Sequence, residues 1–321
     1  MIAKGSSRAV AADEDVAGVR LPTAAPFHLE ATVRVLQRRP SSHELWDGNR
    51  YLRVFTTTDG LVLTAVENRG SIDAPDVRLS FLAGKPSAET QRSLGQAIRK
   101  MLGLAVDPAP LHAAAVRLRG LQSTALSLRG MRPPRFATLF DTFGNVVPFQ
   151  QLSLDAGAAI VGRLVERFGE QVTHRDRTFA AFPTASAVAG ARLSALLRCG
   201  LSRSKAESLR CLAKAVESGE VSEEAIAQLG TSDALKRLIE LPGIGPWSAA
   251  LVLLRGFGRL EVFPPGDSGA ERGLNALLRL RKPESLARVV ERFGECRGYL
   301  YFCGLGASLL AKGLIHGAGT A

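Results

Sequence analysis

The chain has 321 residues, of which 46% are hydrophobic, so it is long enough to bury the cores of two domains. No apolar run is long enough to span a bilayer, and residues 1–20 lack the apolar stretch of a secretory signal, so we expect a cytoplasmic protein. The formal net charge of +11 at pH 7 favours polyanionic partners such as nucleic acid or acidic membranes.

The cysteines do not form a recognisable ligand pattern. They are Cys199, Cys211, Cys296 and Cys303. Their spacing matches neither paired zinc ligands nor the tight clusters that hold iron and sulfur. We therefore expect reduced thiols that are mostly buried, and neither a metal nor another cofactor.

The first part of the chain predicts a small α+β domain over residues 26–105. Residues 1–25 have no periodicity and are expected to be disordered. Four short runs rich in β-branched residues then predict an antiparallel sheet: FHLEATVRVL, YLRVFTTTDG, LVLTAVEN and VRLSFLAG. The next run, AETQRSLGQAIRKMLGL, has helical spacing.

The second part predicts a mainly α domain. Residues 106–129 are expected to form a helical connector, and residues 130–316 are dominated by helical periodicity that Gly and Pro interrupt. Between Asp107 and Asp141 every charged side chain is an arginine: Arg117, Arg119, Arg129, Arg132 and Arg135. The predicted fold class is therefore α+β, with an antiparallel N-terminal domain followed by a helical domain.

A glycine-containing hairpin joins two predicted helices. The string LPGIGPWSA places Gly243 and Gly245 on either side of Ile244. Ile244 can enter the core while the glycines let backbone N–H groups approach a ligand closely. These groups and the positive end of the following helix suit a phosphate, although a bare Gly-x-Gly is more often only a tightly packed helical hairpin.

An isolated carboxylate, Asp267, follows the second helix in the string VFPPGD. An aspartate at this place usually caps the next helix. Residues 268–271, however, have the S-x-x-E spacing of a capping box, so we expect Ser268 to cap the helix and Asp267 to be free for another role.

Hairpin and aspartate together resemble the helix-hairpin-helix (HhH-GPD) DNA glycosylase superfamily. The segments RPPRFATLFDTFGNVVPFQQLS, FPTASAV, CGLSRSKAESL and LRGFGRLEVFPPGD are similar to its alkyladenine branch, 3-methyladenine DNA glycosylase II. The resemblance covers about residues 26–316. It implies a monomeric enzyme that binds double-stranded DNA with damaged bases, flips the damaged nucleotide out and cleaves its N-glycosidic bond.

The resemblance assigns roles to individual residues. Asp267 corresponds to the catalytic carboxylate, which stabilises the sugar cation as the base departs. Bifunctional relatives carry a lysine where this chain has Trp247, so a monofunctional glycosylase without lyase activity is expected. Trp247 matches an aromatic residue of the base pocket and Leu251 lies one turn beyond it, whereas without the family Trp247 would be read equally well as a core residue.

Further residues correspond to DNA contacts. Leu152 matches the apolar wedge that fills the gap left by the flipped nucleotide, and Gln150 and Gln151 lie beside it. Without the family, Leu152 would be read as a core residue. The hairpin residues expected to meet the DNA backbone are Gly243, Ile244, Gly245 and Ser248.

Two departures from the family pattern leave the substrate open. Leu251 stands where better-known members have a pocket tyrosine, and Cys296 stands where they often have a tryptophan. A glycosylase for alkylated bases is the leading hypothesis. The alternatives are a glycosylase for another lesion, such as a deaminated base, and a non-catalytic protein that binds damaged DNA.

Overall fold

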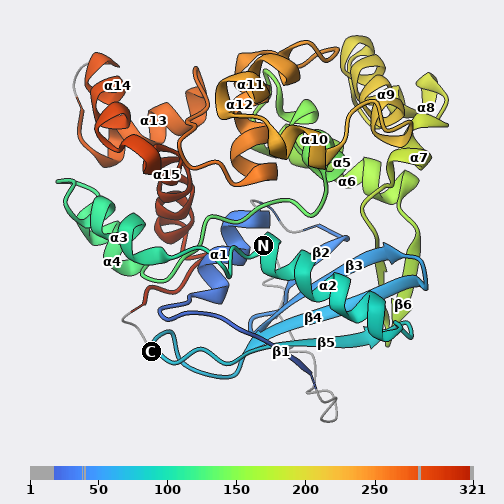
Figure 1. The fold of residues 1–321 in the computed structure, drawn as a ribbon, viewed down its shortest axis with the longest axis horizontal. Helices are drawn as coiled ribbons and strands as arrows, with labels where there is room; N and C mark the ends of the chain where they lie inside the picture. The colour runs from blue at the N-terminus through green and yellow to red at the C-terminus, as the bar shows by residue number, and fades with distance from the viewer. Residues whose placement is uncertain (1–17, 38, 40, 281–282, 319–321) are drawn as a thin grey trace, which may run out of the picture.

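The computed structural model describes residues 18–318, apart from residues 38, 40 and 281–282. Two layers make up the molecule, a β-sheet with its helices and a larger layer of helices that lies along one edge of it (Figure 1). The predicted α+β class is confirmed.

A sheet of five antiparallel strands, in the order β1-β5-β4-β3-β2, forms the first layer. Its central hairpin pairs β3 with β4 from Arg50↔Glu67 to Thr57↔Gly60, and Gly60 supplies the positive φ of the turn. The strands are β1 (Val19–Leu21), β2 (Glu44–Trp46), β3 (Arg50–Thr57), β4 (Gly60–Asn68) and β5 (Val77–Ala83).

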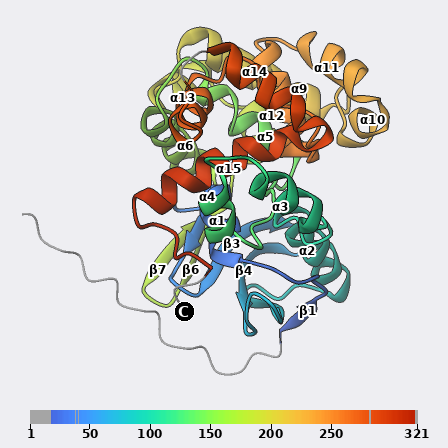
Figure 2. The same cartoon turned by 90° about the vertical axis from the view of Figure 1, so that its left-hand side faces the viewer.

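Both faces of this sheet are covered. On one face, α1 (Leu29–Gln37) and α2 (Ala88–Met101) bury an apolar core with Tyr51, Val66 and Leu79 of the strands. On the other face lies a hairpin of β6 (Gln171–His174) and β7 (Arg177–Ala180), which inserts Phe179 between Leu52, Val54, Leu63 and Ala65. Figure 2 shows α2 and the β6–β7 hairpin on opposite sides of the sheet. The expectation of a mainly helical second domain did not include this hairpin.

One predicted strand is a helix. The run FHLEATVRVL was expected in the sheet, but residues 29–37 form α1. Its β-branched residues lie between two cores, since Val33 packs against the sheet and Val35 against the helical layer. Burial on both sides outweighs the weak β preference of valine, and this tertiary effect has no local sequence signal.

The ordered structure begins earlier than predicted. Residues 18–25 belong to the segment that we expected to be disordered, yet Val19, Arg20 and Leu21 pair with β5 as strand β1. Residues 1–17, on which the rest of that prediction falls, lie outside the described residues.

The helical layer contains the connector as well as the predicted helical domain. Connector residues Leu111, Ala115, Leu121 and Ala125 are buried in the same core as the later helices. The helices up to the hairpin are α3 (Pro108–Val116), α4 (Gln122–Ser127), α5 (Leu139–Gly144), η1 (Val147–Phe149), α6 (Leu154–Phe168), α7 (Ala185–Ala189), α8 (Leu193–Arg198), α9 (Arg203–Glu217), α10 (Glu223–Gln228) and α11 (Thr231–Ile239). The others are α12 (Pro246–Val252), the π-helical turn η2 (Leu253–Phe257), α13 (Ser268–Leu277), α14 (Pro283–Arg292), η3 (Gly294–Cys296) and α15 (Arg297–Ala311).

Buried arginines join the two layers. Arg255 of η2 is fully buried, donates to the carbonyls of Val35 and Leu36 at the end of α1, and lies over the rings of Phe136 and Phe302. Arg53 of β3 reaches from the sheet to Asp141 of α5, with 2.5 Å between Nη2 and Oδ2. The Arg255 contacts fix η2 to α1, and the Arg53 contact fixes α5 to the sheet.

Candidate active site

The hairpin loop, residues 240–245, joins α11 to α12. Ile244 is buried, as its pattern predicts, while Gly243 and Gly245 are exposed on either side of it. Gly245 is the N-cap of α12 and has no side chain to bond the first N–H groups, and Pro246 follows at the first helical position. The loop therefore presents backbone N–H groups to solvent at the positive end of a helix.

The two glycines are required for different reasons. Gly243 has φ +76°, and a Cβ there would lie 2.2 Å from the Ser208 Oγ of α9, so the close packing of the hairpin on α9 demands glycine. A Cβ at Gly245 would meet nothing within 4 Å. No internal contact explains Gly245, and the space above it is open to a ligand.

The chain then returns to the surface through a rigid loop. Gly258, with φ +73°, ends η2, and a Cβ at this position would lie 2.6 Å from Cδ of Arg135. Arg135 donates to the Phe257 carbonyl at 2.6 Å. Gly266, with φ +68°, then turns the chain into α13 immediately before Asp267.

Asp267 is itself the N-cap of α13, which corrects the prediction that Ser268 caps this helix. Its Oδ1 accepts from the Ala270 backbone N–H at 2.9 Å, and Ser268 is the first helical residue. The S-x-x-E pattern was misleading because the helix begins at Ser268, one residue earlier than a Ser268 cap requires. The capping role uses only one of the two carboxylate oxygens.

The second oxygen of Asp267 bonds Trp247. The indole Nε1–H of Trp247, in the first turn of α12, donates to Oδ2 at 3.0 Å. Both side chains are partly exposed. Each oxygen of Asp267 thus accepts one hydrogen bond. The two donors belong to different helices, α12 and α13, and together they fix the orientation of the carboxylate.

Leu251 does not reach this surface. It was expected to contact a substrate one turn beyond Trp247, but it is fully buried in the main core together with its neighbours Ala250 and Val252. Leu251 therefore packs in the core, on the buried side of the helix that carries Trp247, and has no surface to offer a substrate. Cys296 is partly buried, and the nearby backbone of Gly298 donates to the Leu260 carbonyl of the loop that leads to Asp267.

A second exposed element, the 149–152 turn, lies beside the hairpin. Leu152 has 44% of its surface exposed, so it is not a core leucine. Gln151 is also exposed and has φ +55°, a conformation that non-glycine residues rarely adopt. The predicted wedge therefore projects from a strained turn.

Gln150 connects this turn to the hairpin. Its side-chain Nε2 donates to the Gly243 carbonyl at 2.7 Å and to Ser248 Oγ at 2.9 Å. Ser248, which was expected to contact DNA, is only 2% exposed, so its hydroxyl serves this internal contact. Sequence reasoning placed Gln150 near the DNA but missed the contact, because residues 150 and 243 are far apart in the chain.

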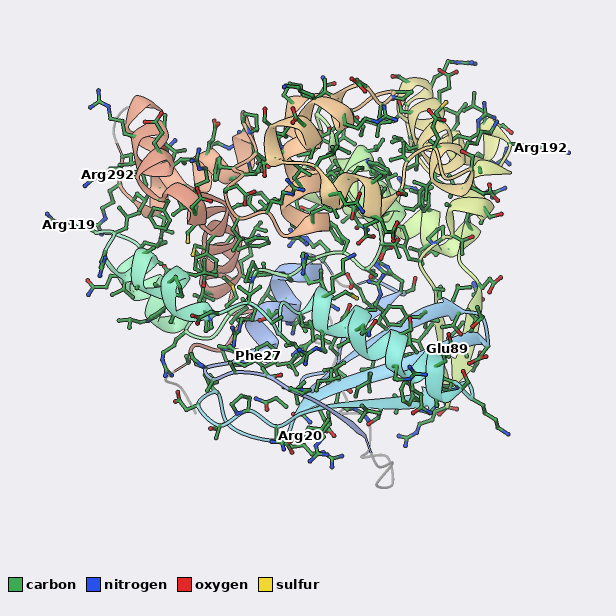
Figure 3. The ribbon with its side chains drawn as sticks, viewed as in Figure 1. Arg20, Phe27, Glu89, Arg119, Arg192 and Arg292 are labelled. Atoms are coloured by element: carbon green, nitrogen blue, oxygen red, sulfur yellow. The ribbon has the colours of Figure 1, made fainter. Side chains whose placement is uncertain are left out.

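Labelled arginines project from both ends of the helical layer (Figure 3). Figure 3 shows Arg192 projecting at one end, and Arg119 and Arg292 at the other. Arg129 instead pairs with Asp73, and Arg132 is fully buried and donates to the carbonyls of Val106, Ala24 and Pro26. The arginines between Asp107 and Asp141 therefore include both surface charges and structural groups.

A separate cavity of about 420 Å³ lies between the sheet and the helical layer, lined among others by Arg53, Phe55, Asp141 and Glu223. Behind it His43 is buried against Phe182, and burial, with a smaller contribution from Arg53, lowers the pKa of His43 to about 3. None of the site residues named above lines this cavity. It is a feature of the junction between the layers.

The described part of the chain has no metal-binding cluster and no membrane-spanning helix. No group of three or more His, Cys, Asp or Glu side chains there is arranged to hold a metal ion, and the four cysteines are free thiols. Among the same residues, no helix has the length and apolar character needed to cross a membrane.

Comparison with known proteins identifies relatives of this chain. Residues 146–295 match the model of the HhH-GPD superfamily base excision DNA repair proteins. The chain is 26% identical to the DNA-3-methyladenine glycosylase of Bacillus subtilis over 60% of this chain and 64% of that protein. It is 27% identical to DNA-3-methyladenine glycosylase 2 of Escherichia coli over 74% of this chain and 81% of that protein.

The same fold occurs in a solved structure. The 3-methyladenine DNA glycosylase from Archaeoglobus fulgidus superposes with a TM-score of 0.73 at 23% identity, covering 92% of this chain and 99% of that one. At this identity the likeness establishes the arrangement of elements, including the N-terminal sheet. The chain spans less than two thirds of the length of the Bacillus subtilis relative.

Proposed function

Since residues 146–295 form an HhH-GPD domain of the base excision DNA repair superfamily, we propose that this protein is a monofunctional DNA glycosylase that hydrolyses the N-glycosidic bond of alkylated bases such as 3-methyladenine. One observation carries the proposal: the Asp267 carboxylate is held at the N-terminus of α13 by Trp247, next to an exposed glycine hairpin. The substrate class comes from the names of the two bacterial relatives.

Asp267 acts through its charge. As the bond from the sugar to the damaged base lengthens, positive charge develops on the sugar, and a fixed carboxylate stabilises it without reorganising. The same carboxylate can orient the water that adds to the sugar carbon. An alkylated purine with a positive charge is already a good leaving group, so no strong general acid is needed.

The hairpin and the 149–152 turn bind the duplex. The N–H groups around Gly245 hold a backbone phosphate, which positions the protein without reading the base sequence. Leu152 enters the minor groove and fills the gap left by the flipped nucleotide, while Gln151 contacts the neighbouring bases. The partner is double-stranded DNA that contains damaged bases.

The residue at position 247 supports the monofunctional assignment. Trp247 occupies the first turn of α12, and by resemblance to the superfamily this is the position at which bifunctional members carry the lysine that attacks the sugar and forms a Schiff base. The product is then an intact abasic site. Borohydride should trap no covalent adduct between protein and DNA during turnover, and a trapped adduct would contradict the monofunctional assignment.

Asp267→Asn tests the proposal. Excision of 3-methyladenine from a defined duplex, measured as alkali-labile abasic sites in single turnover, should fall by about two orders of magnitude or more, because the charge opposite the sugar is lost. Asparagine can still cap α13 through its oxygen, but its NH₂ group then faces the Trp247 N–H, so a modest loss of thermal stability should accompany the effect.

Two results would reject the enzyme. If Asp267→Asn excises at the wild-type rate once corrected for its folded fraction, then Asp267 is only a helix cap. If the wild-type protein binds a lesion duplex and leaves no abasic site with alkylated or deaminated bases, then it is a binding protein. Activity on deaminated bases alone would keep Asp267 in its role and change the substrate.

A further inference from the structure

The contact between Gln150 and the hairpin joins the two elements proposed to touch DNA. A backbone carbonyl can only accept, so the Gln150 amide must turn its nitrogen toward Gly243, and the same nitrogen also reaches Ser248 Oγ. Both N–H bonds of the amide are therefore used within the protein. Gln150 is thus oriented by the hairpin and is not free to read a base with these donors.

The turn that follows Gln150 is held under strain. Gln151 adopts a left-handed conformation, which costs about 1 kcal/mol or more for a residue with a side chain and persists only where its surroundings fix it. The Nζ of Lys205 in α9 donates to the carbonyls of Pro148 and Gln150, directly before the strained residue. Gln150 is thus anchored through both its side chain and its carbonyl.

The helix that supplies this anchor also supports the hairpin. Ser208, one turn after Lys205 on α9, lies against Gly243, where there is no room for a Cβ. α9, the hairpin and the 149–152 turn therefore form one packed unit in which the exposed Leu152 has a fixed position relative to Gly245. A phosphate held by the hairpin and a side chain entering the minor groove are then tied to the same rigid body.

We propose that Gln150 is a positioning residue that couples hairpin binding to insertion of Leu152, by fixing the 149–152 turn to the Gly243 carbonyl and Ser248. The inference rests on the proposed function, because it takes Leu152 as the inserting residue. With the coupling in place, hairpin binding brings Leu152 to the groove already oriented. Without the Gln150 contact, the 149–152 turn must adopt its bound conformation anew each time Leu152 is inserted.

The test separates insertion from excision. The probe is a duplex with 2-aminopurine beside a tetrahydrofuran abasic-site analogue, which has no base to remove and changes fluorescence when Leu152 enters the stack. In Gln150→Leu the rate of this change should fall about thirty-fold, the effect expected from losing two hydrogen bonds of ordinary net strength. The Kd for an undamaged duplex should stay within about two-fold, because the hairpin itself is intact.

Two further variants serve as controls for folding and for the chemical change itself. Gln150→Glu preserves size and polarity but cannot donate to the Gly243 carbonyl, so it should slow insertion in the same direction and guards against a folding defect of the leucine variant. Gln122→Leu makes the same chemical change at an exposed site on α4 and should insert at the wild-type rate.

A double-mutant cycle tests whether Gln150 acts through Leu152. Since Leu152→Ala removes the inserting side chain, Gln150→Leu should add little to it in single-turnover excision. Full additivity would overturn the coupling. So would a loss of affinity for undamaged duplex as large as the loss of insertion rate, because that pattern indicates a general structural role.

The outcomes distinguish this inference from the proposed function. If the wild-type protein excises bases and Gln150→Leu inserts as fast as the wild type, only the coupling is wrong. If the wild type inserts at the abasic analogue, Gln150→Leu slows insertion and no base is ever released, the coupling stands and the glycosylase activity is wrong.

Discussion

The hydrogen bond between Trp247 and Asp267 predicts a specific effect of Trp247→Phe. This substitution keeps a six-membered aromatic ring in the first turn of α12 but removes the Nε1–H that donates to Oδ2 at 3.0 Å. The carboxylate then keeps only its capping bond to Ala270 and can rotate. If Trp247 is mainly a positioning residue, the chemical step should slow although an aromatic surface is still present.

The size of the effect follows from the kind of bond. A hydrogen bond to a charged group is worth about 1.5–3 kcal/mol, and partial exposure of both side chains places this one near the lower limit. Since about 1.4 kcal/mol corresponds to a factor of ten, kcat should fall about ten-fold. The KM should change little, because the lost interaction serves the carboxylate and not substrate binding.

Single-turnover excision by wild type, Trp247→Phe and Trp247→Leu is the assay. A pure stacking role for Trp247 requires Trp247→Phe to resemble the wild type and Trp247→Leu to be strongly impaired, and this pattern would refute the reasoning. The bond makes a second prediction for thermal unfolding. Asp267→Asn should cost less stability in the Trp247→Phe background, because the indole N–H that would face the asparagine NH₂ is gone.

Two other predictions concern the hairpin and the junction between the layers. In Gly245→Val the new Cβ meets no protein atom, so the melting temperature should fall only slightly, through the poorer N-cap, while every duplex is bound more weakly and the salt dependence of binding is reduced. In Gly243→Ala the new Cβ collides with Ser208, so the melting temperature should fall clearly. An unchanged affinity in Gly245→Val would exclude this hairpin as a phosphate site. Because the pKa of buried His43 is lowered from 6.5 to about 3, only the unfolded chain gains this proton as the pH falls below 6.5, so stability is lost in that direction. From pH 7.5 to pH 5 the loss is about 2 kcal/mol, and denaturant unfolding of His43→Phe should lack this part of the slope.

Local sequence patterns correctly predicted the elements whose structure does not depend on packing against distant segments. The runs that form β3, β4 and β5 are rich in β-branched residues, alternate in part and are bounded by turn residues, and they were predicted as strands. Residues 29–37 carry a similar β-branched composition but lie between two cores, and only the assembled molecule decides that they form a helix. The sequence of a segment alone does not predict how many of its faces will be buried by the rest of the fold.

Charge was the least predictable property of the chain. The net charge counts Arg53, Arg132 and Arg255 equally with surface arginines, although all three are buried and bond carboxylates or backbone carbonyls within the fold. The number of charges that can meet DNA is therefore smaller than the composition implies. The burial of these arginines depends on carbonyl groups from distant segments, so no local sequence pattern predicts it.

The position of Asp267 shows that a helix cap and the proposed catalytic role do not exclude each other. A capping side chain is held by the helix N-terminus, whose partial positive charge favours a carboxylate, and it uses only one oxygen in doing so. The other oxygen is then held at a known place and can be oriented by a second group, here Trp247. A freely rotating aspartate, which the sequence argument sought, would have to be ordered in the transition state at an entropic cost. Capping thus orients the carboxylate for the role proposed for it, and a cap signal in the sequence does not argue against that role.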